Sequence, residues 1–223
     1  MTSQPGLSTS ALLVGIGGGS GSGKSALAQA LVAALGPGRA ALLAHDAYYR
    51  DGAARSVGAR AMADYDVPEA LDQALFLQHL GALRAGRSVR PPNYSVTIHR
   101  RVGDGVAVLP RPIVVVEGVF LLWDPTVRAR LDLRIFLDAP ERVRFERRLA
   151  RDVGERGRTP EAVLTQLATT VREAHHTYVE PTRAMADLVL GTSGRLEPLA
   201  EIAAAVVLDR FARRGGDRAR IAS

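Results

Sequence analysis

The chain has 223 residues, and its 47% hydrophobic content is enough for one sizeable core. It contains no cysteine, which excludes disulfides, thiolate catalysis and thiolate zinc sites. The formal net charge of +6 invites a nucleic-acid partner. However, the densest arginine segment, 142–158, is interleaved with acidic residues, and no nucleic-acid module accompanies it. We therefore expect no nucleic-acid binding and attribute the charge to small phosphate-bearing ligands.

Targeting signals are not visible in the sequence. No apolar run approaches 18 residues, and the first ten residues lack both a basic start and an apolar stretch. We expect a cytoplasmic protein with no membrane segment. We also expect a disordered tail at 1–10, a single domain at 11–214 and a flexible tail at 215–223.

Short apolar runs separated by helical patterns set the fold class. Leu27, Leu31 and Leu35 mark one face of a helix over 24–35. Near-continuous apolar strands of this kind are typical of a parallel sheet covered on both faces. The sequence therefore predicts an α/β three-layer sandwich with a five-stranded parallel sheet. The predicted strands are 11–17, 40–44, 113–117, 131–138 and 187–190.

Two segments depart from this alternation. Residues 88–109 hold two prolines, an alternating stretch and the turn GDG, which predict a β-hairpin insert that forms one wall of a pocket. Residues 141–178 carry two helical patterns joined by GERGR. In the first pattern Phe145, Leu149 and Val153 form an apolar stripe, and Arg144, Arg148 and Arg151 share another face. An arginine-faced helical hairpin of this kind indicates a closing lid.

The strongest motif is GGSGSGKS, which fits G-x-x-x-x-G-K-[ST] and lies between a predicted strand and a predicted helix. Backbone N–H groups of such a loop wrap phosphate oxygens at a helix N-terminus, and the final serine can bind Mg²⁺. A flexible Gly/Ser linker is the alternative, but a linker has no reason to join a buried strand to an amphipathic helix. The predicted phosphate-binding residues are Gly18, Gly19, Ser20, Gly21, Ser22, Gly23, Lys24 and Ser25.

Lys24 is the only lysine of the chain, because the other 28 basic residues are arginines. A slim ammonium can lie between β- and γ-phosphate oxygens inside a tight loop, whereas a planar guanidinium is too broad. The position thus requires a lysine.

Two carboxylates end predicted strands at the edge where ligands bind in such sheets. Asp46 can serve as the general base toward an attacking hydroxyl, or it is an ordinary cap or turn residue. Glu117 can support Mg²⁺, or it is satisfied by a salt bridge at the strand end.

Seven segments, in order, carry a family resemblance: GGSGSGKS, HDAYYRD, YDVPEALD, PNYSVTIHR, VVVEGVFLL, RRLARDVGERGR and VEPTRAMADLVL. Together they resemble uridine/cytidine kinases of the P-loop kinase superfamily, over about residues 11–190. The resemblance implies phosphoryl transfer from ATP, or alternatively GTP, with Mg²⁺ held by Ser25, Asp46 and Glu117. It also implies a homo-oligomer, most often a tetramer.

Individual roles follow from the same resemblance. Asp46 resembles the base that accepts the nucleoside 5′-hydroxyl proton, with Tyr49 in the same site. Asp66 resembles the carboxylate that binds the ribose diol, beside Tyr65, although an aspartate that begins a helix before a proline is the alternative. Tyr94 and His99 resemble base contacts, although a lone histidine is more often a plain surface or core residue.

The lid positions resemble family residues at the phosphates and the ribose. Arginines here can neutralise charge on the transferring phosphoryl group. The expected set is Arg148, Arg151, Arg156, Arg158 and Gln166, with Arg148 and Arg151 nearest the chemistry, whereas Arg142 and Arg147 are expected to be solvated.

Two departures from the family pattern leave specificity open. Tyr94 is followed by Ser95-Val96, and the loop expected to hold the donor base reads GTSGRLEP. We therefore consider three functions. The protein is a kinase of uridine or cytidine, a kinase of another acceptor such as nicotinamide riboside or a sugar phosphate, or a non-catalytic nucleotide-binding regulator.

Overall fold

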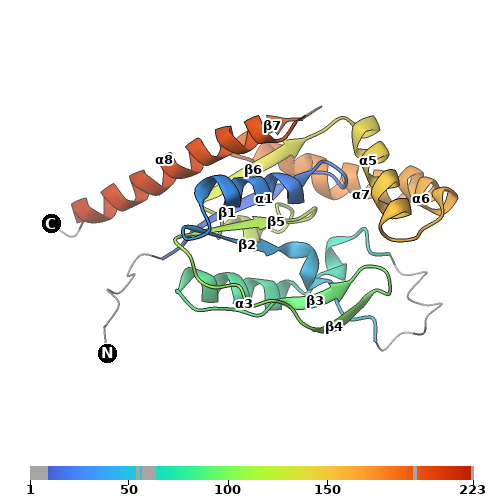
Figure 1. The fold of residues 1–223 in the computed structure, drawn as a ribbon, viewed down its shortest axis with the longest axis horizontal. Coiled ribbons are helices and arrows are strands. Elements are labelled where there is room, and N and C mark those ends of the chain that lie inside the picture. Colours follow the sequence, from blue (N-terminus) through green and yellow to red (C-terminus); the bar gives the residue numbers. More distant parts are fainter. Residues whose placement is uncertain (1–9, 54–55, 57–63, 193–194, 222–223) are drawn as a thin grey trace.

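A computed structural model describes residues 10–53, 56, 64–192 and 195–221 (Figure 1). All five predicted strands form one sheet in the order β2-β5-β1-β6-β7, and every neighbouring pair is parallel. The strands are β1 (Leu12–Gly17), β2 (Ala40–Ala44), β5 (Ile113–Glu117), β6 (Leu133–Asp138) and β7 (Leu188–Gly191). The predicted fold class is confirmed.

The central strand β1 is apolar throughout because both of its faces are covered. Leu12, Val14 and Ile16 pack into the same buried cluster as α1 (Lys24–Leu35) and α8 (Glu197–Ile221). Leu13 alternates to the opposite face and joins a second cluster. This burial on two sides leaves only the strand ends open for chemistry.

The second face of the sheet is covered mainly by α3 (Gln73–Arg84) and the short α4 (Pro125–Arg128). Each helix begins at an aspartate whose side chain caps it: Asp72 accepts from the Leu75 amide, and Asp124 accepts from the Thr126 amide.

The carboxyl ends of β1, β2 and β5 lie at one edge of the sheet. β1 leads into the glycine loop and α1, and β2 leads into a short 3₁₀-helix, His45–Tyr48. β5 ends at Glu117, which is paired in register with Ile16 of β1 and Ala44 of β2. The topology therefore places the glycine loop, Asp46 and Glu117 side by side.

The predicted hairpin insert is present as a separate antiparallel sheet of β3 (Pro92–Ser95) and β4 (Arg100–Asp104). Arg101 fastens it to the main body, because its guanidinium donates to the carbonyls of Tyr48 and Tyr49 and pairs with Asp72 at 3.2 Å. The hairpin is thereby tied to the segment that follows β2.

The predicted lid region is helical. It contains α5 (Glu141–Gly154), α6 (Pro160–Gln166) and α7 (Arg172–Ala174), with π-helical turns at Leu167–Val171 and His175–Val179 and a 3₁₀-helix at Glu180–Met185. The apolar stripe predicted on α5 packs against Val163 and Leu167 in a small cluster of its own. The region therefore has a core separate from the two clusters that flank the sheet.

The structure describes the two predicted tails only in part. Residues 1–9, 222 and 223 lie outside the described residues. Helix α8 continues to Ile221, past residue 215, at which the sequence analysis begins a C-terminal tail. Within the described part of the chain, no helix has the length and apolar character needed to cross a membrane.

Candidate active site

The glycine loop between β1 and α1 has a backbone shape that requires glycine. Gly21 has φ 78°, and a side chain at this position would collide with the carbonyl oxygen of Arg144. Gly23 has φ 99° and caps α1, which begins at Lys24. Loop amides and the first turn of a 12-residue helix thus face the same space, as a phosphate site requires.

Lys24 is buried beneath this loop, with 6% of its surface exposed, and its ammonium donates to the Gly19 carbonyl at 3.0 Å. Burial lowers the pKa of Lys24, and the nearby carboxylates of Glu117 and Asp46 oppose that shift. The ammonium therefore lies between the loop and the two acidic side chains.

Glu117 is 5% exposed, and burial together with the charge of Asp46 raises its pKa to about 7. The ammonium of Lys24 and a hydrogen bond from Ser25 act in the opposite direction. Two carboxylates this close favour a cation between them. A hydroxyl with two carboxylate side chains also fits the hard oxygen ligands that Mg²⁺ prefers. Among the residues that the structure describes, no cluster of three or more His, Cys, Asp or Glu side chains could hold a metal, so the remaining ligands would be phosphate and water oxygens.

A cavity of about 920 Å³ opens beside the loop and collects the predicted side chains. It is lined by the phosphate-loop residues Ser20, Gly21, Lys24 and Ser25, and by all the site residues predicted outside that loop: Asp46, Tyr49, Tyr65, Asp66, Tyr94, His99, Glu117, Arg148, Arg151, Arg156, Arg158 and Gln166. The other predicted loop residues, Gly18, Gly19, Ser22 and Gly23, are not on its lining. One space thus joins the phosphate loop to the hairpin and the lid.

Four rings form one wall of the cavity. Tyr65 and His99 are stacked, with centroids 3.8 Å apart and planes 6° apart, and Tyr49 and Tyr94 are stacked at 5.2 Å. The Tyr94 hydroxyl and His99 Nδ1 lie 3.2 Å apart and share a hydrogen bond. The hairpin is therefore a wall of the pocket, as predicted, and it presents flat aromatic faces.

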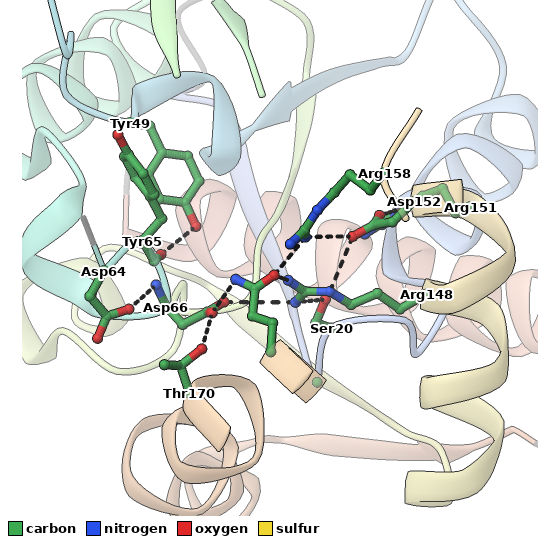
Figure 2. Close-up of polar contacts among 12 residues, drawn as sticks. Ser20, Tyr49, Asp64, Tyr65, Asp66, Arg148, Arg151, Asp152, Arg158 and Thr170 are labelled. Carbon is green, nitrogen blue, oxygen red and sulfur yellow. Dashed lines mark hydrogen bonds and ion pairs between the residues drawn. The ribbon is translucent and has the colours of Figure 1, made fainter. Parts of the chain in front are cut away.

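Asp66 directly follows Tyr65 in the chain, and its carboxylate is held by the lid (Figure 2). Oδ2 accepts from Gln166 Nε2 at 2.9 Å and from Thr170 Oγ1 at 2.8 Å, and Oδ1 is 3.7 Å from the guanidinium of Arg148. The short helix Pro68–Ala70 has no side-chain cap. Asp66 is therefore a cavity carboxylate and does not begin a helix.

Gln166 connects that carboxylate to the arginines. Its Oε1 accepts from Arg158 at 2.6 Å and from Arg148 at 3.2 Å, while its Nε2 donates to Asp66. Arg148 also donates to Ser20 of the phosphate loop at 2.9 Å. A continuous chain of polar contacts therefore runs from Asp66 through Gln166 and Arg148 to Ser20 of the phosphate loop.

The expectation that Arg147 is solvated is wrong, because its guanidinium donates to the Ser22 carbonyl at 3.0 Å behind the phosphate loop. Arg142, in contrast, is exposed and pairs with Glu146 one turn away, as expected. Arg144 is 3% exposed and packs against Gly19, a contact that its helical face alone did not reveal.

Several cavity residues were not predicted from the sequence, and two of them, Thr170 and His175, make polar contacts near the predicted site. Thr170 binds Asp66, and His175, also in the lid region, lines the cavity. Burial and the charge of Arg144 lower the pKa of His175 to about 4, so it is neutral at pH 7 beside Glu180, 3.4 Å away. Helical spacing could have placed both residues on the lid, but it carries no signal that they face the cavity.

The sequence profile of the Phosphoribulokinase / Uridine kinase family matches residues 13–195, most of the chain. The chain belongs to this family. A relative from Chloroflexus aurantiacus, named uridine kinase, is 40% identical over 189 residues, which are 85% of this chain and 90% of the relative. Another from Deinococcus deserti, also named uridine kinase, is 41% identical over 193 residues, which are 86% of this chain and 93% of the relative.

The fold of this chain also resembles that of a solved phosphoribulokinase from Rhodobacter spheroides, with a TM-score of 0.60. The two are 15% identical, and the match covers 84% of this chain and 74% of the other. At that identity the likeness concerns the fold alone. The resemblance found in the sequence is confirmed at the level of the family. The name of that family includes two kinases whose acceptor substrates differ.

Proposed function

We propose that this protein phosphorylates the 5′-hydroxyl of uridine, cytidine or both, with ATP as phosphoryl donor. The supporting observation is the single cavity in which Lys24 and Ser25 lie at one end and Asp66 and the aromatic wall at the other, with Asp46 also on its lining. The uridine kinase relatives match over most of their length at about 40% identity. A phosphate site joined to a site for a diol and a flat ring fits a nucleoside acceptor.

At the donor end, loop amides and Lys24 bind the β- and γ-phosphates. Mg²⁺ would be held by Ser25, Glu117 and Asp46, and when bound it neutralises charge on the phosphate oxygens. The pKa of Glu117 is raised to about 7 even with the Lys24 ammonium nearby, and a divalent cation would lower the cost of its negative charge further. GTP is the alternative donor, because the loop GTSGRLEP departs from the family pattern for holding the donor base.

At the acceptor end, Asp66 accepts hydrogen bonds from the ribose diol. Gln166 and Thr170 hold its Oδ2, so the carboxylate is oriented before the nucleoside arrives. Tyr65, Tyr94 and His99 contact the base. In this role Gln166 acts on the substrate partly through Asp66.

Transfer itself requires a base and a positive surface. Asp46 lines the cavity beside Lys24 and accepts the proton of the attacking hydroxyl. The lid arginines, Arg148 and Arg151 foremost, balance charge as the phosphoryl group moves. Closure of the lid excludes water and so limits ATP hydrolysis.

The alternatives make different predictions. A kinase of nicotinamide riboside or of a sugar phosphate would share the donor end and differ at the aromatic wall. A nucleotide-binding regulator would bind ATP without turnover, and the presence of both Asp46 and Asp66 in one cavity counts against it.

ADP release, measured with uridine, cytidine, nicotinamide riboside and ribulose 5-phosphate, tests the proposal, and the nucleoside monophosphate is identified directly. We expect turnover with uridine or cytidine at least about tenfold above the other acceptors, and none in Lys24→Ala. A stronger preference for another acceptor, or ATP binding without ADP formation, would contradict it. A cytoplasmic location and a homo-tetramer belong to the same proposal.

A further inference from the structure

Asp152, on α5, is fully buried, and its carboxylate is the shared ion-pair partner of four arginines. Nitrogen–oxygen distances are 3.5 Å to Arg148, 2.9 Å to Arg151, 3.0 Å to Arg156 and 3.5 Å to Arg158. Figure 2 shows Arg148, Arg151 and Arg158 around this side chain. The sequence analysis did not assign Asp152 a role.

The two carboxylate oxygens hold the arginines differently. Oδ1 accepts hydrogen bonds from Arg151 Nε and from an Arg156 terminal nitrogen, both at 3.0 Å. Oδ2 is 3.5 Å from Arg148 and from Arg158, whose hydrogen bonds go to other side chains of the cavity wall. Two arginines are therefore fixed by Asp152, and two are drawn toward it while they bind elsewhere.

Asp152 does not line the cavity, whereas all four of its arginine partners do. The carboxylate therefore lies behind the arginine wall and cannot touch a substrate. Its influence on any reaction in the cavity must pass through the guanidinium groups.

Four guanidinium groups gathered at one point repel each other, and a buried carboxylate is the counter-charge that holds them together. One negative charge does not neutralise four positive charges, so the wall keeps a positive excess toward the cavity. Groups that are fixed before the reaction stabilise developing charge without a cost of reorganisation.

We propose that Asp152 is a positioning residue that holds the arginine wall in the geometry needed for phosphoryl transfer. This inference rests on the proposed function, and it concerns the transfer step more than nucleotide binding. The loop and Lys24 still bind the donor phosphates when the arginines are disordered.

Asp152→Asn removes the charge and keeps the shape of the side chain. We expect kcat to fall by about tenfold or more, while the Kd of a non-hydrolysable MgATP analogue changes by less than about threefold. Asp152→Glu restores the charge at a displaced position, and an intermediate kcat is expected. Glu155→Gln is the matched control, because it removes an exposed carboxylate three positions away and should leave kcat unchanged.

A second measurement does not depend on turnover. Arg151 Nε–H donates to Asp152, so its NMR resonance should be protected from exchange in the wild type and assignable through its loss in Arg151→Lys. We expect the signal to merge with those of solvated arginines in Asp152→Asn and to persist in Glu155→Gln.

Rates are compared well below the Tm of each variant, so that the folded fraction is the same. Wild-type kcat in Asp152→Asn, or a persistent protected Arg151 signal, would overturn the inference. Should Asp152→Asn not fold, wild-type kcat in Asp152→Glu would overturn it as well. A wild type without nucleoside turnover would contradict the proposed function instead, and the Arg151 signal would still decide the role of Asp152.

Discussion

Thr170 and Asp66, 104 positions apart, are joined by a 2.8 Å hydrogen bond from the threonine hydroxyl to Oδ2 of the carboxylate. Thr170 lies in a π-helical turn of the lid region, and Asp66 lies in the segment before α3. The bond links the lid to the residue proposed to hold the ribose diol.

Thr170→Val should therefore weaken nucleoside binding. We expect the nucleoside KM to rise about threefold to tenfold, because one hydrogen bond to a charged group is lost, while kcat and the KM of MgATP stay close to wild type. Steady-state kinetics with each substrate varied in turn will check this. Thr169→Val is the control, because the hydroxyl of Thr169 donates to a helix carbonyl. Equal effects of the two variants would refute the role of Thr170.

Asp66→Ala should act on the same step and more strongly. If the carboxylate accepts both ribose hydroxyls, the wild type should discriminate against 2′- and 3′-deoxyuridine, and Asp66→Ala should lose that discrimination along with nucleoside affinity. The kcat/KM ratios for the three nucleosides give the answer. An unchanged preference for the ribose in Asp66→Ala would place the diol elsewhere.

Asp46→Asn should separate binding from chemistry. The amide keeps the size of the side chain but cannot accept the proton of the attacking hydroxyl, so turnover should fall by about 10² to 10⁴. The affinity for ATP measured by calorimetry without Mg²⁺ should remain within about threefold of wild type, because Asp46 also belongs to the residues proposed to hold the metal. Wild-type turnover in this variant would remove Asp46 from the role of base.

Lys24→Arg tests why one lysine persists among 28 arginines. The ammonium of Lys24 is buried and bonded to the Gly19 carbonyl, and a broader guanidinium has no room there. We expect kcat/KM for MgATP to fall by about 10² or more, as far as in Lys24→Met. If arginine supports near-normal turnover, size is not the reason for the lysine.

Glu117→Gln should change how stability depends on pH. The pKa of Glu117 is raised from 4.5 to about 7, so the folded protein binds an extra proton between these values. The contribution of this raised pKa to the free energy of unfolding is full below pH 4.5 and is lost as the pH rises through about 7. From pH 5 to 8, the unfolding free energy of the ligand-free wild type should therefore fall relative to that of Glu117→Gln. Urea unfolding at several pH values measures both, and parallel curves would contradict the raised pKa.

The same carboxyl should release its proton when MgATP binds near pH 7, because a cation beside it restores the ionised form. Calorimetry of binding in two buffers that differ in ionisation enthalpy counts the protons. We expect release in the wild type and little in Glu117→Gln, and equal values in both proteins would exclude Glu117 as the source.

The strands, α1 and the phosphate loop could be predicted from the sequence, because each rests on neighbours along the chain. The run from residue 12 to 35 holds an apolar strand, a glycine turn and a helical face in one continuous segment. Backbone geometry then leaves few alternatives, since glycine adopts the φ of 78° at Gly21 without strain and any side chain there would collide with the Arg144 carbonyl.

The lid region shows where prediction from helical periodicity stops. Periodicity on α5 revealed an apolar face and an arginine face, but both pack against other elements: Leu149 packs into the lid core and Arg144 packs against the phosphate loop. A helical pattern reports which residues share a face and does not report what lies opposite. Arg147 was misread for this reason.

The sequence alone determined that the chain is a phosphate-binding α/β protein with acidic residues at the ends of its strands, because these features are set by local spacing and by the edge rule of parallel sheets. Only the tertiary structure decided that Thr170 holds Asp66, that Gln166 bridges two arginines to it and that Asp152 gathers four arginines. Contacts between residues about a hundred positions apart depend on how separate elements pack, and no pattern along one segment contains that information. The arginine partners of Asp152 lie within six positions of it, but its complete burial behind the cavity wall is set by that packing.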